Sequence, residues 1–242
     1  VALLSSGKII GGNNGLAQLI LPRNAFAIHG DRFVLRDKST RHTIAGGRVI
    51  DPHAPKRGRT KPDRISALKA MRVNNKEKIL TSLVELSEIG VGVSQFSLSH
   101  NLLPTQTDAL LRDLELKRVG PKHDQQVFSK VKWRFLLDRI VENIAKFHKS
   151  ETSSFGPSIK DIQFLLNPSP NVEVLKEALK VLILNKEVLI HGYRFQLPSH
   201  HVSISKQNRV LLDRSENFLT ADFGTPLSLN QAAEKIGVQS AA

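Results

Sequence analysis

Residues 133–147 read WRFLLDRIVENIAKF, a stretch in which large apolar side chains recur at helical intervals. Trp133, Leu137, Ile140, Ile144 and Phe147 are spaced by 4, 3, 4 and 3 residues. That spacing places all five on one face of a helix with 3.6 residues per turn. We therefore predict a long amphipathic helix that buries this face against neighbouring elements.

The residues after this helix predict two further helices and a β-hairpin. A short helix is expected over 159–166 and a longer one over 172–185. Residues 188–190 and 193–197 then alternate around a His-Gly turn, as in a hairpin. Helix, short helix, helix and hairpin is the order of a winged-helix domain, so we predict one over 131–200.

The same order of elements occurs once before this stretch. The expected elements are a short helix over 65–71, a helix with Ile79, Leu80, Leu83, Val84 and Leu86 inward, a helical segment over 94–103, a helix that starts at Pro104, and a hairpin that turns at Gly120-Pro121. We therefore predict a first winged-helix domain over 65–130, in tandem with the second.

A third unit is expected to begin in residues 201–242. Residues 209–219 predict its first helix, and Ser228-Leu229-Asn230-Gln231 is a capping box for a second helix that Gly237 closes. The sequence stops before a recognition helix, and it starts at Val1 without a methionine. We therefore expect a third winged-helix domain that is truncated, in a chain cut at both ends.

The first 51 residues predict strands and no helix. Four short strands are expected, over 17–21, 26–28, 32–36 and 48–50, after a turn at Gly11-Gly12-Asn13-Asn14-Gly15. Four short strands alone would leave the edges of their sheet unpaired. We therefore predict that residues 1–51 are the C-terminal part of a larger antiparallel β-barrel. Residues 52–64 hold three prolines without periodicity and predict a basic linker. The expected fold is multidomain, a partial barrel followed by tandem winged-helix (α+β) domains.

The charge of the chain predicts a polyanionic partner. Lys and Arg number 35 against 22 Asp and Glu, which leaves a net charge of +13 and a pI near 10.2. Residues 1–62 hold 11 of the basic and 3 of the acidic side chains, a net charge of +8. Such an excess favours nucleic acid as the partner.

Composition also excludes several classes of protein. The absence of cysteine excludes disulfides, thiolate catalysis and Cys-ligated metals, and it fits a cytosolic protein. No apolar run approaches the roughly 18 residues that a membrane-spanning helix needs, so we expect no membrane partner.

No catalytic or metal-binding set is expected in this sequence. Gly7-Lys8 resembles the end of a phosphate-binding loop, but Ala2 and Ile9 occupy the positions where that motif needs Gly and Ser or Thr. The nine histidines lack helical metal spacing, and His200-His201 follows a proline in a loop. We therefore expect no enzyme activity, no metal and no cofactor in this chain.

Basic clusters are the candidate binding residues. The linker cluster is Lys56, Arg57, Arg59 and Lys61, and the first-hairpin cluster is Lys117, Arg118, Lys122, Lys130, Lys132 and Arg134. Cations that neutralise phosphates release counterions, so binding through them should weaken steeply with salt. The alternative is that both clusters only solvate a linker and a hairpin.

The third helix of each predicted winged-helix domain has a nearly neutral outer face. The outward residues are Thr105, Gln106, Asp108, Arg112 and Asp113 in the first, and Asn171, Glu173, Lys176, Glu177 and Lys180 in the second. A helix that reads the DNA major groove is normally rich in arginine. We therefore interpret both domains as spacers or protein-docking modules.

Two segments near the start carry a family resemblance. GDRFVLRD at 30–37 and TIAGGRV at 43–49 resemble the end of the last β-barrel of elongation factor Tu-like translational GTPases. A barrel of this translation-factor type, followed by a Pro/Arg/Lys linker and tandem winged helices, resembles in particular the selenocysteine-specific elongation factors. Within the barrel segment, Arg36, Arg41 and Arg48 match the region where related factors approach tRNA.

The resemblance implies a role in translation. Such factors are cytoplasmic GTPases that use GTP and Mg²⁺, carry selenocysteinyl-tRNA to the ribosome and bind an mRNA hairpin that recodes UGA through C-terminal winged helices. This chain would be an RNA-binding or spacer fragment, without the nucleotide domain or the hairpin-reading winged helix. Two alternatives stay open, a winged-helix DNA-binding transcriptional regulator and a protein-docking scaffold.

Overall fold

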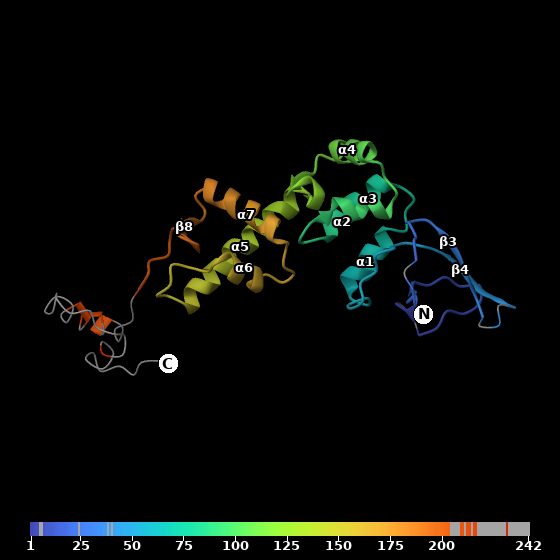
Figure 1. Ribbon diagram of the computed structural model, residues 1–242, viewed down its shortest axis with the longest axis horizontal. Coiled ribbons are helices and arrows are strands. Elements are labelled where there is room, and N and C mark those ends of the chain that lie inside the picture. The colour runs from blue at the N-terminus through green and yellow to red at the C-terminus, as the bar shows by residue number, and fades with distance from the viewer. Residues whose placement is uncertain are drawn as a thin grey trace.

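The computed structural model describes residues 1–203 except 5, 6, 24, 38 and 40, and then residues 209, 210, 212, 213, 215, 216 and 231. Residues 228–230 of the predicted capping box and residues 211, 214 and 217–219 of the predicted helix at 209–219 lie outside the described residues. The described elements follow one another along an elongated molecule, with β3 and β4 near one end and β8 towards the other (Figure 1).

The N-terminal part consists of two small antiparallel sheets. β1 (Ala2–Leu3) pairs with β2 (Ala17–Gln18), and β3 (Arg32–Arg36) pairs with β4 (Thr43–Arg48). Residues 26–28 form no strand, contrary to prediction, and the Phe26 side chain lies fully exposed. The last strand was predicted over 48–50 but lies over 43–48. It ends at Arg48 because Arg48 pairs with Arg32, the first residue of β3.

A first helical unit spans residues 62–128. Its elements are α1 (Pro62–Ala70), α2 (Lys76–Leu86), β5 (Val91–Gly92), α3 (Val93–Ser99), α4 (Pro104–Asp113), β6 (Lys117–Val119), the 3₁₀ turn η1 (Lys122–Asp124) and β7 (Gln126–Phe128). The three strands form an antiparallel sheet in the order β5-β7-β6. Buried apolar side chains from α2, α3, α4 and β7 form its core around Ile79, Leu80 and Val84.

Local chemistry explains where these helices begin and end. Pro62 and Pro104 occupy the first turns of α1 and α4, so α1 begins inside the segment predicted as linker. α3 stops at Ser99, before the predicted end at 103, because Asn101 takes a positive φ of 48°. Leu86, predicted to face inward, is 43% exposed at the end of α2.

A second helical unit spans residues 130–196. It consists of α5 (Lys130–Ser150), α6 (Ile159–Leu165), α7 (Val172–Leu184) and the hairpin of β8 (Leu189–His191) and β9 (Arg194–Gln196). The predicted stripe on α5 is confirmed at Trp133, Leu137, Ile140 and Ile144, which are buried, whereas Phe147 at its end is only partly buried. The Ser129, Ser158 and Asn171 side chains accept hydrogen bonds from backbone N–H groups and cap α5, α6 and α7.

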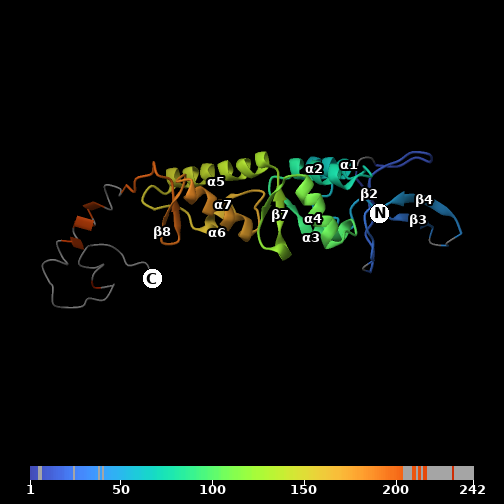
Figure 2. The same cartoon turned by 90° about the horizontal axis from the view of Figure 1, so that it is seen from above.

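The hairpin of the first helical unit contributes to the hydrophobic core of the second. Val119 and Phe128 belong to the hairpin of the first unit, yet both are buried among the core residues of the second. The Phe128 ring meets the Trp133 ring edge-on, with centroids 5.3 Å apart. Figure 2 shows β7 between α4 on one side and α6 and α7 on the other. The hairpin therefore packs the two units against each other.

Polar contacts reinforce this joint and a second one at the N-terminal end. Arg139 on α5 pairs with Glu88 at 2.9 Å, across the two helical units. At the other joint, Arg64 on α1 pairs with Asp51 at 2.6 Å, where both side chains are largely shielded from solvent. The His29 N–H also donates to the Ser99 carbonyl oxygen at 2.6 Å, so the strand region is fastened to the first helical unit.

No helix among the described residues is both long and apolar enough to cross a bilayer.

Candidate nucleic-acid interface

The β3–β4 hairpin presents arginines on its surface. Arg32 and Arg48 are exposed and stand directly opposite each other in the antiparallel register. Side chains opposite each other in a sheet lie on the same face, and like charges there repel. A phosphate placed between these two guanidinium groups would relieve that repulsion.

The other two predicted hairpin residues lie towards its turn. Arg36 is exposed at the end of β3, beside a register shift between Leu35 and Arg36. The exposed Arg41 sits in the connection to β4, where its backbone N–H donates to Asp37 Oδ1 at 3.0 Å. The sequence pattern did not single out Arg32. Side chains at alternate positions of a strand point to the same face, so Arg32, four residues before Arg36, could have been assigned to the same surface.

The linker cluster is available to a partner. Lys56, Arg57 and Lys61 are exposed and Arg59 is partly exposed. The chain turns here at Gly58, whose φ is +71° and whose carbonyl oxygen accepts from the Lys61 N–H at 3.2 Å. Within the described part of the chain, none of the four cations forms an ion pair with a carboxylate.

The first-hairpin cluster is partly neutralised by its neighbours. Arg118 lies 3.9 Å from Asp108 and Lys130 lies 3.7 Å from Glu115. Arg134 donates two hydrogen bonds to Glu187, at 3.1 and 3.0 Å, and pairs with Asp138 at 2.9 Å. The hydrogen bonds from Arg134 lower the pKa of Glu187, which keeps that carboxylate ionised at neutral pH.

The other three members of the first-hairpin cluster have no carboxylate partner among the described residues. Lys117 Nζ lies 5.8 Å from the centroid of the Trp133 ring, and Lys132 Nζ lies 5.8 Å from that of Phe135. Lys122 is exposed in η1. This cluster therefore offers a polyanion fewer uncompensated charges than its sequence indicates.

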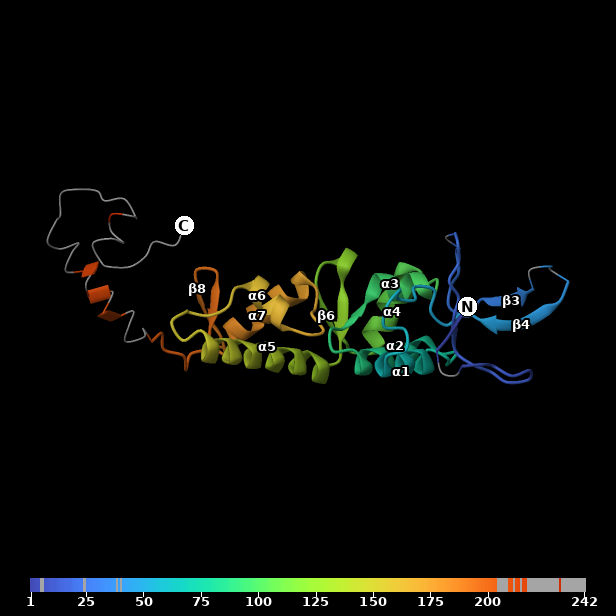
Figure 3. The same cartoon turned by 90° about the horizontal axis from the view of Figure 1, so that it is seen from below.

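The fold brings only some of the predicted residues together. The β3–β4 hairpin and α1, which follows the linker, lie at the N-terminal end, whereas β6 lies between the two helical units (Figure 3). A hydrogen bond from Gln18 Nε2 to the Pro55 carbonyl oxygen, at 3.0 Å, ties the start of the linker to β2. Hairpin arginines and linker cations thus lie in the same N-terminal part of the molecule, and the first-hairpin cluster stands apart from them.

The histidines form stacked pairs, and no metal cluster is found in the described ranges. His200 stacks on His148 with ring centroids 3.8 Å apart. Their Nε2 atoms lie 3.0 and 3.3 Å from the carbonyl oxygens of Ser154 and Phe155, respectively. At the other end of the molecule, His100 lies between Phe96 and His29, with centroid distances of 4.2 and 4.6 Å.

These stacks predict a loss of stability in mild acid. Burial lowers the pKa of His100, and burial together with the charge of His200 lowers the pKa of His148, from an ordinary value of 6.5. The unfolded chain therefore takes up these protons first, so the free energy of unfolding decreases as the pH falls through 6.5. Thermal unfolding at pH 7.5 and 5.5 should show a lower Tm at pH 5.5.

The variant His148→Phe separates this effect from general acid denaturation. Phenylalanine keeps a flat ring against His200 but takes up no proton, so the fall in Tm between the two pH values should shrink. His53→Gln, at an exposed position, should leave that fall unchanged. An equal fall in His148→Phe and wild type would contradict the assignment.

Comparison with known proteins agrees with the predicted resemblance. Residues 1–56 match the family model for the selenocysteine-specific elongation factor, beta-barrel domain. The chain is 23% identical over 222 residues to the selenocysteine-specific elongation factor of Escherichia coli (strain K12). The aligned region covers 87% of this chain and 34% of that protein. The chain is also 24% identical over 210 residues to the selenocysteine-specific elongation factor of Desulfomicrobium baculatum. This alignment covers 84% of the chain and 32% of that protein.

The chain spans about a third of the length of these curated relatives. The match to the barrel family includes β1 to β4 and continues into the start of the linker. The β-barrel region predicted at the N-terminus is thereby confirmed. Residues 1–56 thus match the β-barrel domain of the selenocysteine-specific elongation factors, and most of the chain is similar in sequence to two such factors.

Proposed function

We propose that this chain contacts RNA as part of a translation factor that works at selenocysteine codons. The observation that carries the proposal is the linker cluster without ion pairs among the described residues, together with the exposed arginines of the β3–β4 hairpin. Four cations without carboxylate partners in the described structure attract phosphate, and each phosphate contact releases counterions. The similarity to selenocysteine-specific elongation factors makes selenocysteinyl-tRNA and the ribosome, in the cytoplasm, the proposed partners.

In this proposal the helical units are winged-helix domains that act as a rigid arm. Both units support this assignment, because each has helices, including a short one, followed by a hairpin. The isolated β-bridge between Ser158 and Arg194 also supports it, because it takes the place in the second unit that the pairing of β5 with β7 has in the first. Packing of Val119 and Phe128 into the core of the second unit supports a fixed arrangement of the two domains in this proposal. Such an arm would hold a further winged-helix domain, the proposed reader of the mRNA hairpin, away from the barrel.

GTP and Mg²⁺ would act elsewhere in the parent protein. The residues of this chain do not fit a phosphate loop, since Gly7-Lys8 lies between β1 and β2 and residues 7–16 form no helix. A phosphate loop cradles its ligand at the start of a helix. We therefore assign no catalytic step to this chain.

The neutral outer faces of α4 and α7 disfavour the alternative of a DNA-binding regulator. Asp108 on α4 faces Arg118, and Lys176 on α7 pairs with Glu173 at 2.8 Å. Excess duplex DNA should therefore compete no better than excess tRNA for binding to the chain. Preferential displacement of tRNA by one DNA sequence would favour the regulator.

The RNA-contact proposal is tested by the salt dependence of tRNA binding. Lys56, Arg57, Arg59 and Lys61 are changed together to alanine, and the affinity for fluorescein-labelled tRNA is measured by anisotropy from 50 to 300 mM KCl. Each phosphate contact that is lost lowers the slope of log Kd against log salt by about 0.9. We expect the slope to fall by about 2–4 and the affinity at 100 mM KCl to fall at least tenfold.

Arg118, Lys130 and Arg134 provide a matched control. Changing these ion-paired cations to alanine removes nearly as much formal charge, but their carboxylate partners already neutralise them. We expect the control to change the slope by less than about 1. Equal slopes in the linker variant and the wild type would refute the linker interface.

A further inference from the structure

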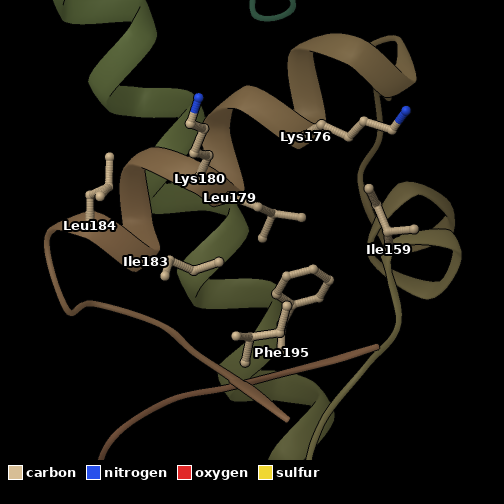
Figure 4. A pocket seen from close by; sticks show the side chains of 8 residues that line it. Ile159, Lys176, Leu179, Lys180, Ile183, Leu184 and Phe195 are labelled. Atoms are coloured by element: carbon tan, nitrogen blue, oxygen red, sulfur yellow. The ribbon is translucent and has the colours of Figure 1, made fainter. Parts of the chain in front are cut away.

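A groove opens between α7, the start of α6 and the β8–β9 hairpin. It has a volume of about 270 Å³ and lies on the second helical unit, away from the linker and the arginine hairpin. Figure 4 shows its lining side chains, of which all but Ile190 are labelled. The lining residues are Ile159, Lys176, Leu179, Lys180, Ile183, Leu184, Ile190 and Phe195.

The groove has a buried floor and exposed apolar edges. Leu179 and Phe195 are almost fully buried and belong to the core of the second unit. Leu184 and Ile190 are 73% and 51% exposed, although both are large aliphatic side chains. Exposed apolar residues around a concave apolar floor are typical of an interaction site.

Two lysines of α7 make the rim positive. Figure 4 shows the amino groups of Lys176 and Lys180 pointing outward, while the Phe195 ring lies among the aliphatic side chains. Lys176 pairs with Glu173 one turn earlier on α7. Lys180 has no ion-pair partner in the described part of the chain. A carboxylate on an occupant of the groove would compensate the charge of Lys180.

The chemistry of the lining favours a peptide over a nucleic acid. All the lining residues except the two lysines are hydrocarbon in character, so the floor offers no hydrogen-bond group to a base edge or a phosphate. The volume lies just below the range of about 300–1,000 Å³ that is usual for small-molecule pockets, which suits a few apolar side chains.

The groove lies on a different face of its hairpin from the one that the first hairpin buries against the next unit. Val119 and Phe128, which lie in the core of the second unit, correspond by register to His191 and Gln196, not to Ile190 and Phe195. Among the described residues, Leu184 and Ile190 remain exposed.

We propose that this groove docks a short acidic segment of a partner protein. The segment inserts two neighbouring large apolar side chains between Leu184, Ile190 and Phe195 and places a carboxylate near Lys180. This inference does not rest on the proposed RNA contact, because it concerns a different surface and a different class of partner.

Peptide display on the 242-residue chain tests the proposal. A phage library of random 12-residue peptides is selected on the wild-type chain and counter-selected on the variant Leu184→Asp. Leu184 is mostly exposed, so the variant is expected to fold, which circular dichroism verifies. We expect the enriched peptides to share paired large apolar residues and a net negative charge.

Anisotropy with one enriched peptide, labelled with fluorescein, then measures the contribution of each side chain. Leu184→Asp and Ile190→Ser should each weaken binding at least tenfold, and Lys180→Glu should weaken it at least threefold. The matched control is Phe164→Ser on α6, which removes an 89% exposed aromatic ring that does not line the groove. Its Kd should equal that of the wild type.

Three outcomes would overturn the proposal. The first is a selection that yields no peptides beyond those that also bind Leu184→Asp. The second is enrichment of peptides with net positive charge. The third is displacement of the bound peptide by a single-stranded RNA 20-mer whose own binding is weakened by Leu184→Asp, which would make the groove a nucleic-acid contact.

Discussion

Replacing Phe128 by alanine is expected to lower the free energy of unfolding by about 3–5 kcal/mol, the usual cost of removing a buried aromatic ring. Phe128 is fully buried, and its ring contacts Trp133 at the start of α5. It also covers Gly90, where an added Cβ would overlap the ring. The substitution leaves a cavity at the junction of the two helical units.

Because the cavity lies where a strand of the first unit packs into the core of the second, both units should lose stability together. Trp133 is the single tryptophan of the chain and reports on the junction by fluorescence during urea denaturation. Amide hydrogen exchange in α2 and in α7 reports on the first and second units separately. We expect the urea midpoint to fall and exchange to accelerate in both helices.

Phe164→Ala is the control, since the exposed ring contributes little and its loss should change stability by less than about 0.5 kcal/mol. Faster exchange in α7 alone, with α2 unchanged in Phe128→Ala, would show that the units unfold independently. That result would contradict the rigid arm in the proposed function.

Replacing Gly156 by alanine is the second large effect that we expect. Gly156 has a φ of +143°, a backbone conformation that residues with a Cβ rarely adopt. A Cβ at this position would overlap the Phe195 carbonyl oxygen and approach His148 Nε2. The overlap is with backbone, so rotation of a side chain cannot relieve it.

Hydrogen bonds hold this loop in place on both sides of the clash. Arg194 Nη1 donates to the Gly156 carbonyl oxygen at 2.8 Å, and the Phe195 N–H donates to the Pro157 carbonyl oxygen at 3.0 Å. Backbone strain costs about 1–3 kcal/mol and overpacking costs a further 1–3 kcal/mol, roughly. We expect Gly156→Ala to lower the free energy of unfolding by about 3 kcal/mol or more in thermal or urea unfolding.

Gly192→Ala isolates the backbone part of that cost. Gly192 has a φ of +61° at the turn between β8 and β9, but an added Cβ there meets no atom within 4 Å. This variant should lose only about 1–2 kcal/mol, the penalty of the left-handed conformation. Equal losses in the two variants would contradict the clash with Phe195.

Local patterns were sufficient to predict most of the helices. Apolar spacing predicted α5 and α7, and prolines in the first turn indicated where α4 begins. The pattern was insufficient at residues 26–28, where two apolar side chains two residues apart predicted a strand. Strands form only where a neighbouring strand supplies hydrogen bonds, and residues 26–28 have no such partner among the described residues.

The candidate interface was predictable only in part for a similar reason. Charge density along the chain predicted the linker cluster, and the family resemblance indicated the hairpin arginines. The pairing of Arg134 with Glu187 joins residues 53 positions apart, so no local pattern reveals it. The apolar groove was missed as well, because its lining comes from α6, α7 and both strands of a hairpin.

The sequence by itself determined the order of the elements, the excess of positive charge near the N-terminus and the resemblance to selenocysteine-specific elongation factors. These properties depend on residue type and short-range spacing, which the chain carries before it folds. Only the tertiary structure decided which cations remain unpaired, which hairpin is buried between the two units and where an apolar groove stays open. Those properties depend on contacts between residues far apart in the chain, and packing alone brings such residues together.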